Sequence, residues 1–177
     1  MANKLFIIGT GVALCGTLSS CLGDSTTEKY EAWRQQNDAY IAAINTDEYE
    51  KVVPDWAPQN SAYIKWHNDR SLTAGNLVAM SNSTVNIKYE LENIEGKKLE
   101  NSYSVSTGDS VYQSTPNANV IGMWIAMTTM HVGDSATVII PYPSGYGSSS
   151  TSKIEPYTNL IFHMKIKSIE AFEKPDS

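Results

Sequence analysis

The chain has 177 residues, enough for one domain with a hydrophobic core and a leading segment. Apolar residues make up 41% of it, which excludes a chain that is disordered throughout. The formal net charge of −6 argues against a nucleic-acid-binding surface, because such a surface needs a basic face. Both cysteines, Cys15 and Cys21, lie near the N-terminus, so the rest of the chain has no disulfide framework.

The N-terminus has the pattern of a targeting signal. One cation, Lys4, precedes an apolar run over residues 5–18, which is shorter than the roughly 20 apolar residues of a transmembrane helix. The run ends in Leu-Ser-Ser-Cys at residues 18–21, which resembles the lipobox of bacterial lipoproteins. That resemblance implies that residues 1–20 are a signal peptide and that Cys21 carries a lipid anchor. The alternative is an ordinary signal peptide with an incidental cysteine.

An amphipathic helix is predicted behind a capping box at Ser25-x-x-Glu28. Its face repeats every three or four residues and consists of Tyr30, Trp33, Asn37, Tyr40, Ile41 and Ile44. This face either packs on the domain that follows or serves as a homodimer or client-binding surface. Residues 47–60 contain two prolines and are predicted to have little regular structure, so residues 21–60 form a tether and a helical segment.

Two stretches of the body alternate strictly between apolar and polar side chains, as strands with one buried face do. The first runs over residues 85–92 and points Tyr89 inward; the second runs over residues 160–167 and points Phe162 inward and His163 outward. Further strands are predicted at residues 63–67, 99–106 and 136–140, with a short one at residues 111–112.

Residues 120–130 form the helix-like stretch of the body, and Gly133 ends it. Trp124 and Met127 share a face at helical spacing, and this face meets the same core as Phe162. Residues 144–152 are rich in glycine and serine and are predicted to be a mobile loop. The pattern predicts an α+β fold, an antiparallel sheet with one short helix on its concave face and an N-terminal helix before it.

A set of short motifs follows these elements in a fixed order. They are residues 85–89, Gly96-Lys97-x-Leu99-Glu100-x-Ser102, Val120-Ile121-x-x-Trp124, Met130-x-Val132-Gly133-Asp134, Ile140-Pro141, Tyr146-Gly147, Ile154-x-Pro156 and Leu160-Ile161-Phe162. Their order and spacing resemble the FKBP-type peptidyl-prolyl isomerases over residues 61–172. With the lipobox and the leading helix, the chain resembles lipid-anchored FKBP-like proteins of Bacteroidetes. The resemblance implies a twisted sheet wrapped around the helix, a domain over residues 61–172 and a tail over residues 173–177.

The resemblance also implies a proline pocket. Its floor is Trp124, its walls are Tyr89, Val120, Ile121, Ile154 and Phe162, and Leu99 and Glu100 stand where the family has phenylalanine and aspartate. The hydroxyl of Tyr146 and the backbone N–H of Ile121 would bind substrate carbonyls at the rim.

The implied function is isomerisation of X–Pro bonds in proline-containing segments of exported proteins. It would take place at the bacterial cell envelope, with Cys21 anchoring the protein to the membrane, most simply the outer one. Such a pocket needs no general base and no cofactor, because the rotation breaks no σ-bond. The scattered histidines do not predict a metal site. The alternative is a catalytically weak or inactive peptide- or protein-binding module, since Leu99, Glu100 and Met123 depart from the family pattern.

Overall fold

The structure, a computed structural model, describes residues 25–105 and 110–171. The predicted signal peptide over residues 1–20, Cys21 and the predicted tail over residues 173–177 lie outside the described residues. Over the ranges that are described, no helix is long and apolar enough to cross a membrane.

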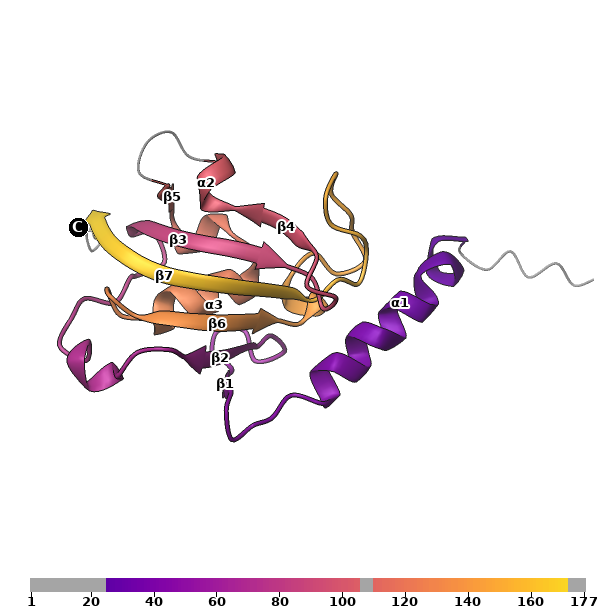
Figure 1. The fold of residues 1–177 in the computed structure, drawn as a ribbon, viewed down its shortest axis with the longest axis horizontal. Helices are drawn as coiled ribbons and strands as arrows, with labels where there is room; N and C mark the ends of the chain where they lie inside the picture. The colour runs from indigo at the N-terminus through magenta and orange to yellow at the C-terminus, as the bar shows by residue number, and fades with distance from the viewer. Residues whose placement is uncertain (1–24, 106–109, 172–177) are drawn as a thin grey trace, which may run out of the picture.

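A seven-stranded sheet forms the body of the molecule, and all its neighbouring strands pair antiparallel (Figure 1). The strands are β1 (Glu50–Val52), β2 (Ala62–Trp66), β3 (Thr84–Glu92), β4 (Lys98–Asn101), β5 (Tyr112–Ser114), β6 (Ser135–Ile140) and β7 (Leu160–Ala171). Their order in space is β1-β2-β6-β7-β3-β4, and β5 pairs with β3. The two strictly alternating strands, β3 and β7, are neighbours, and Leu91 lies opposite Phe162. The predicted α+β fold is confirmed.

The longer helix of the body, α3 (Ile121–Thr129), packs on one face of the sheet and lies behind it in Figure 1. The main core lies between α3 and this face and contains the fully buried Ile64, Ile87, Met127 and Val138. Other short helical segments are α2 (Ser102–Val105) and the 3-10 turns η1 (Arg70–Leu72), η2 (Pro116–Ala118) and η3 (Tyr142–Ser144).

The N-terminal helix α1 (Ser25–Ala42) lies at the end of the sheet where β6 ends and β7 begins (Figure 1). There Tyr40, Ile41 and Ile44 pack with Tyr63, Ile139 and Ile161, which point away from the main core. Because these side chains cover Ile139, and His67 and His163 contact the hydroxyl of Thr137, β6 is buried on both sides and not on alternate residues as the pattern predicted. Of the two roles predicted for the aromatic face of α1, the structure shows packing on the domain.

Two segments differ from the sequence prediction. Residues 47–60 contain β1, whose Lys51 lies opposite Tyr63 of β2, so the sheet includes residues before position 61. A three-residue edge strand is too short to show a period. The strand predicted over residues 99–106 ends at Asn101, and α2 begins at Ser102, whose hydroxyl accepts a hydrogen bond from the N–H of Tyr89 at 3.2 Å. The hydroxyl of Ser102 thus accepts the hydrogen bond that a carbonyl of a partner strand would otherwise accept from Tyr89.

Candidate functional site

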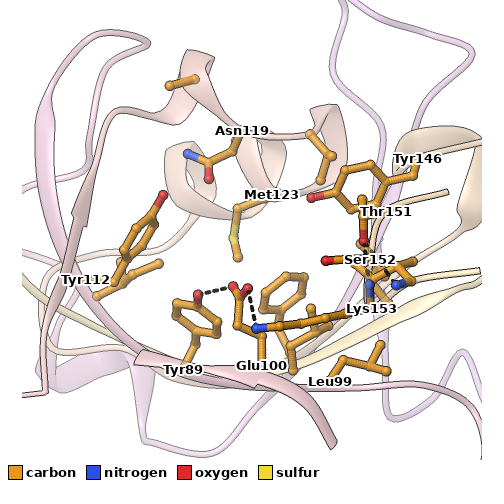
Figure 2. A pocket seen from close by; sticks show the side chains of 17 residues that line it. Tyr89, Leu99, Glu100, Tyr112, Asn119, Met123, Tyr146, Thr151, Ser152 and Lys153 are labelled. Carbon is orange, nitrogen blue, oxygen red and sulfur yellow. Dashed lines mark hydrogen bonds and ion pairs between the residues drawn. The ribbon is translucent and has the colours of Figure 1, made fainter. Parts of the chain in front are cut away.

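A pocket of about 520 Å³ lies beside the N-terminal end of α3, and its volume is in the range of small-molecule and peptide side-chain sites (Figure 2). The sheet contributes its walls from β3, β4, β5 and β7, and residues 151–154 border it on the remaining side. Most of the sheet residues in the lining are apolar or aromatic, as a site for an uncharged ring requires.

Seven of the predicted site residues line this pocket. They are Tyr89, Leu99, Glu100, Val120, Tyr146, Ile154 and Phe162. The alternation of β3 and β7 brings the rings of Tyr89 and Phe162 to one face, with centroids 5.6 Å apart. Tyr112, from the short strand β5, completes the wall and meets the ring of Tyr89 edge-on at 5.7 Å.

Trp124, the predicted floor, is not among the residues that line this pocket, so the geometry gives that role no support. Met123, only 3% exposed, points into the pocket in its place (Figure 2). The ring of Trp124 lies against that of Trp56, with centroids 4.3 Å apart. Neighbouring residues of a helix project about 100° apart, so Met123 and Trp124 lie on different faces of α3.

The reason for this register lies at Gly122. A Cβ at that position would stand 2.2 Å from Cγ2 of Ile140, so only glycine lets α3 approach β6 this closely. Once Gly122 faces β6, the next residue faces the pocket. The sequence could have indicated Met123 as the floor. In the family a glycine directly precedes the floor residue, and here Gly122 directly precedes Met123.

The predicted wall residue Ile121 does not line the pocket either. Its side chain is 36% exposed, while the preceding Val120 is in the lining. Ile121 is the first residue of α3, so its backbone N–H has no partner within the helix. The geometry therefore does not support the side-chain role, and the carbonyl-binding role of the N–H stays a prediction.

Two polar side chains of the pocket, Tyr89 and Lys153, contact Glu100 (Figure 2). The hydroxyl of Tyr89 donates to Oε1 of Glu100 at 2.6 Å, and Nζ of Lys153 lies 3.7 Å from Oε2. Burial, and then the hydrogen bond to Glu100, raise the pKa of Tyr89 above its ordinary value. Burial, followed by the charge of Glu100, also raises the pKa of Tyr146. Both phenols therefore stay protonated at neutral pH and can donate hydrogen bonds.

Chemically, the arrangement can hold an apolar ring against Phe162 and Met123 and offer a hydroxyl donor at the rim from Tyr146. Lys153 was not predicted from the sequence, because its partner Glu100 is far away in the chain and no local pattern links them. Among the described residues, no group of three His, Cys, Asp or Glu side chains is placed to hold a metal ion.

The fold and the pocket together define a class, small α+β proteins whose sheet wraps a short helix and leaves an apolar site at the helix N-terminus. A model of the family described as FKBP-type peptidyl-prolyl cis-trans isomerase matches residues 75–167, and the chain belongs to this family. The family resemblance read from the sequence is thereby confirmed. No curated protein that was compared matches the chain significantly.

Two solved structures have a similar fold. A peptidyl-prolyl cis-trans isomerase from Pseudomonas syringae pv. tomato superposes with a TM-score of 0.61 at 17% identity, over 81% of this chain and 95% of its own. FkpA from Escherichia coli gives a TM-score of 0.61 at 15% identity, over 85% of this chain and 63% of its own. At these identities the likeness shows the fold alone.

Proposed function

We propose that the protein is a peptidyl-prolyl cis-trans isomerase that acts on X–Pro bonds of exported proteins and is held at the cell envelope by a lipid on Cys21. The observation that carries the enzymatic part is the apolar pocket walled by Tyr89, Phe162 and Leu99 in a chain of the FKBP family. The lipobox-like residues 18–21 support the location.

The pocket would act on the electronic structure of the bond. Amide resonance gives X–Pro rotation a barrier of about 18–20 kcal/mol. A twisted imide has less charge separation than a planar one, so an apolar, water-poor site stabilises the transition state relative to the ground state. The proline ring would lie against Phe162 with Met123 beneath it.

Holding the flanking chain would supply a second contribution. The hydroxyl of Tyr146, a residue 39% exposed at the rim, would donate to a substrate carbonyl while the imide rotates. The hydroxyl of Tyr89 already donates to Glu100, which orients this wall of the site. The reaction needs no proton transfer and no covalent intermediate.

Exchange spectroscopy on an X–Pro peptide tests the proposal. We expect the protein to accelerate cis–trans exchange above the uncatalysed rate, and Tyr146→Phe to lower kcat/KM by roughly threefold to tenfold through loss of one hydrogen bond. Exchange at the uncatalysed rate in the presence of saturating folded protein would rule out the enzyme.

A second candidate function is a peptide-binding module without significant catalysis. The observation that favours it is Met123 at the floor, since a methionine with three rotatable bonds holds a ring less rigidly than an aromatic plane does. Leu99 adds a smaller wall than the family phenylalanine. This candidate predicts peptide binding without faster exchange, and catalysis that appears when Leu99→Phe, Glu100→Asp and Met123→Trp are combined.

A further inference from the structure

Beside the pocket, large apolar side chains remain exposed to solvent. Trp56 is 50% exposed and Ile121 is 36% exposed, and the half-buried Trp124 lies against Trp56 with ring centroids 4.3 Å apart and planes tilted by 32°. We call Trp56, Ile121 and Trp124 the aromatic ledge. Large apolar groups that cluster on a surface mark interaction sites more often than single ones do.

The ledge is continuous with the pocket along α3. Val120 lines the pocket, Ile121 follows it directly, and Trp124 is three residues further and shares the helix face of Ile121. Trp56 then extends this face away from the helix through its ring contact with Trp124.

The loop that carries Trp56 also connects to the opposite rim of the pocket. The N–H of Ser61, at the end of this loop, donates to Oγ of Ser144 at 3.0 Å. Ser144 closes η3, and Tyr146, two residues later, lines the pocket. The loop that carries Trp56 is therefore tied to the segment that brings Tyr146 to the pocket.

The exposure of Trp56 is imposed by its turn. The N–H of Ala57 donates to the carbonyl of Pro54 at 3.1 Å, and Ala57 is 5% exposed. The turn thus buries the small alanine and leaves the tryptophan at the surface. Tryptophan is highly buried on average. Its exposure beside a buried alanine therefore makes this surface a candidate interaction site.

We propose that the aromatic ledge binds an apolar or aromatic side chain of the same unfolded polypeptide whose proline occupies the pocket. This inference rests on the proposed function and specifies its substrate class as chains with an apolar residue near the X–Pro bond. Because the ledge adjoins the pocket along α3 and an extended chain advances about 3.3 Å per residue, the contacted side chain lies within a few residues of the proline. Asp55 beside Trp56 and the net charge of −6 disfavour acidic segments.

The test compares three capped peptides on the full-length protein purified in detergent. One is a short X–Pro peptide of about four residues; the second embeds the same core in about twelve residues with Leu and Phe on both sides. The third replaces these apolar residues with Ser. We expect the apolar long peptide to bind about tenfold more tightly than either other peptide, measured by calorimetry, and to have a correspondingly higher kcat/KM.

The readout of the ledge is the ratio of affinities for the apolar and serine long peptides. Trp56→Ser should reduce this ratio from about ten to below about two, and Ile121→Ser should reduce it in the same direction if the first variant folds poorly. The matched control is Leu72→Ser on η1, which removes an 80% exposed side chain outside the ledge and should leave the ratio unchanged.

Three results would overturn the proposed role of the ledge. The first is equal affinity of the wild type for the two long peptides, and the second is an unchanged affinity ratio in Trp56→Ser. The third is a dimer, detected by sedimentation, that Trp56→Ser dissociates without changing the affinity ratio. The last result would assign the surface to a second copy of the chain. Failure of the proposed function looks different. In that case no peptide exchanges faster than in buffer, while the affinity ratio and its dependence on Trp56 persist.

Discussion

Met123 gives the pocket floor a character that differs from an aromatic plane. Its thioether is polarizable and its side chain adapts to the shape of what it contacts, so it can pack under a ring without fixing the ring's orientation. At 3% exposure the side chain has little access to water when the pocket is empty. The floor is therefore flexible and shielded from water. These properties favour binding of a proline ring more than rigid positioning of that ring.

We expect Met123→Gln to weaken binding of a short X–Pro peptide about tenfold. The substitution keeps the length of the side chain but replaces the polarizable thioether with an amide, so the proline ring loses an apolar contact and covers a polar group. Calorimetric titration measures the change. The control is Thr128→Gln near the other end of α3, which should bind within about twofold of the wild type. Equal losses in the two variants would show that the effect comes from α3 and not from the pocket.

Tyr89 should make stability depend on pH in the alkaline range. Burial and its hydrogen bond to Glu100 raise the pKa of this phenol in the folded protein above its ordinary value of 10.0. Its contribution is therefore complete below pH 10 and decreases as the pH rises above 10, because the unfolded chain then loses the proton first.

We predict that the stability advantage of the wild type over Tyr89→Phe shrinks by about 1.4 kcal/mol for each pH unit above 10. Urea unfolding of the two proteins between pH 8 and pH 11 measures the difference, and the other tyrosines cancel in the comparison. A constant difference over this range would mean that the phenol titrates at its ordinary pKa in the folded protein.

At the scale of elements, α1 is joined to the sheet by buried polar contacts as well as by its aromatic face. Oδ1 of Asn37 accepts from the N–H of Asn159 at 2.8 Å, and the side chain of Asn159 donates to the carbonyl of Asn37 at 2.7 Å. Both residues are fully buried. Trp33 adds a hydrogen bond from Nε1 to the hydroxyl of Thr158 at 3.0 Å. These contacts orient α1 on the segment that leads into β7.

Asn37→Ala should lower the free energy of unfolding by about 1–3 kcal/mol, because it leaves the N–H of Asn159 buried without its acceptor. Gln35→Ala on the exposed side of the same helix is the control and should change stability by less than about 0.5 kcal/mol. Urea denaturation measures both. If Asn37→Ala matches the control, α1 is not held on the sheet in solution.

The strands that contribute residues to the pocket could be predicted because each has one buried and one solvent-exposed face. Alternation over β3 and β7 was enough to place Tyr89 and Phe162 on the core side, and both line the pocket. The floor could not be placed in this way, since α3 is buried on most sides and its periodicity does not mark a single face. Its rotation depends on how closely Gly122 approaches Ile140, which is a contact between distant parts of the chain.

Other features escaped prediction for related reasons. β1 has three residues, too few for a period to appear. The side chain of Lys153 meets Glu100 only because a loop and a strand come together in space. The burial of β6 on both faces depends in part on α1, and a strand pattern alone cannot show what covers its second face.

At the scale of the whole molecule, the proposed anchor would keep the domain close to a bilayer. α1 begins at Ser25, so only residues 22–24 separate it from Cys21. Each residue spans at most about 3.6 Å, so the N-terminal end of α1 would stay within about 15 Å of the lipidated residue. Because α1 is packed on the sheet, the orientation of the whole body would be restricted along with the helix.

We predict that Cys21→Ser moves the protein from the membrane fraction to the soluble fraction of its host cells, since the variant cannot receive acyl chains that each contribute about 0.8 kcal/mol per buried CH₂. Cys15→Ser is the matched control, because it removes the other cysteine and leaves residues 18–21 intact. Fractionation followed by immunoblotting measures the distribution, and metabolic labelling with a fatty-acid analogue identifies the modified residue. Membrane retention of Cys21→Ser, or loss of labelling in Cys15→Ser alone, would contradict the anchor at Cys21 while leaving the pocket and its proposed chemistry untouched.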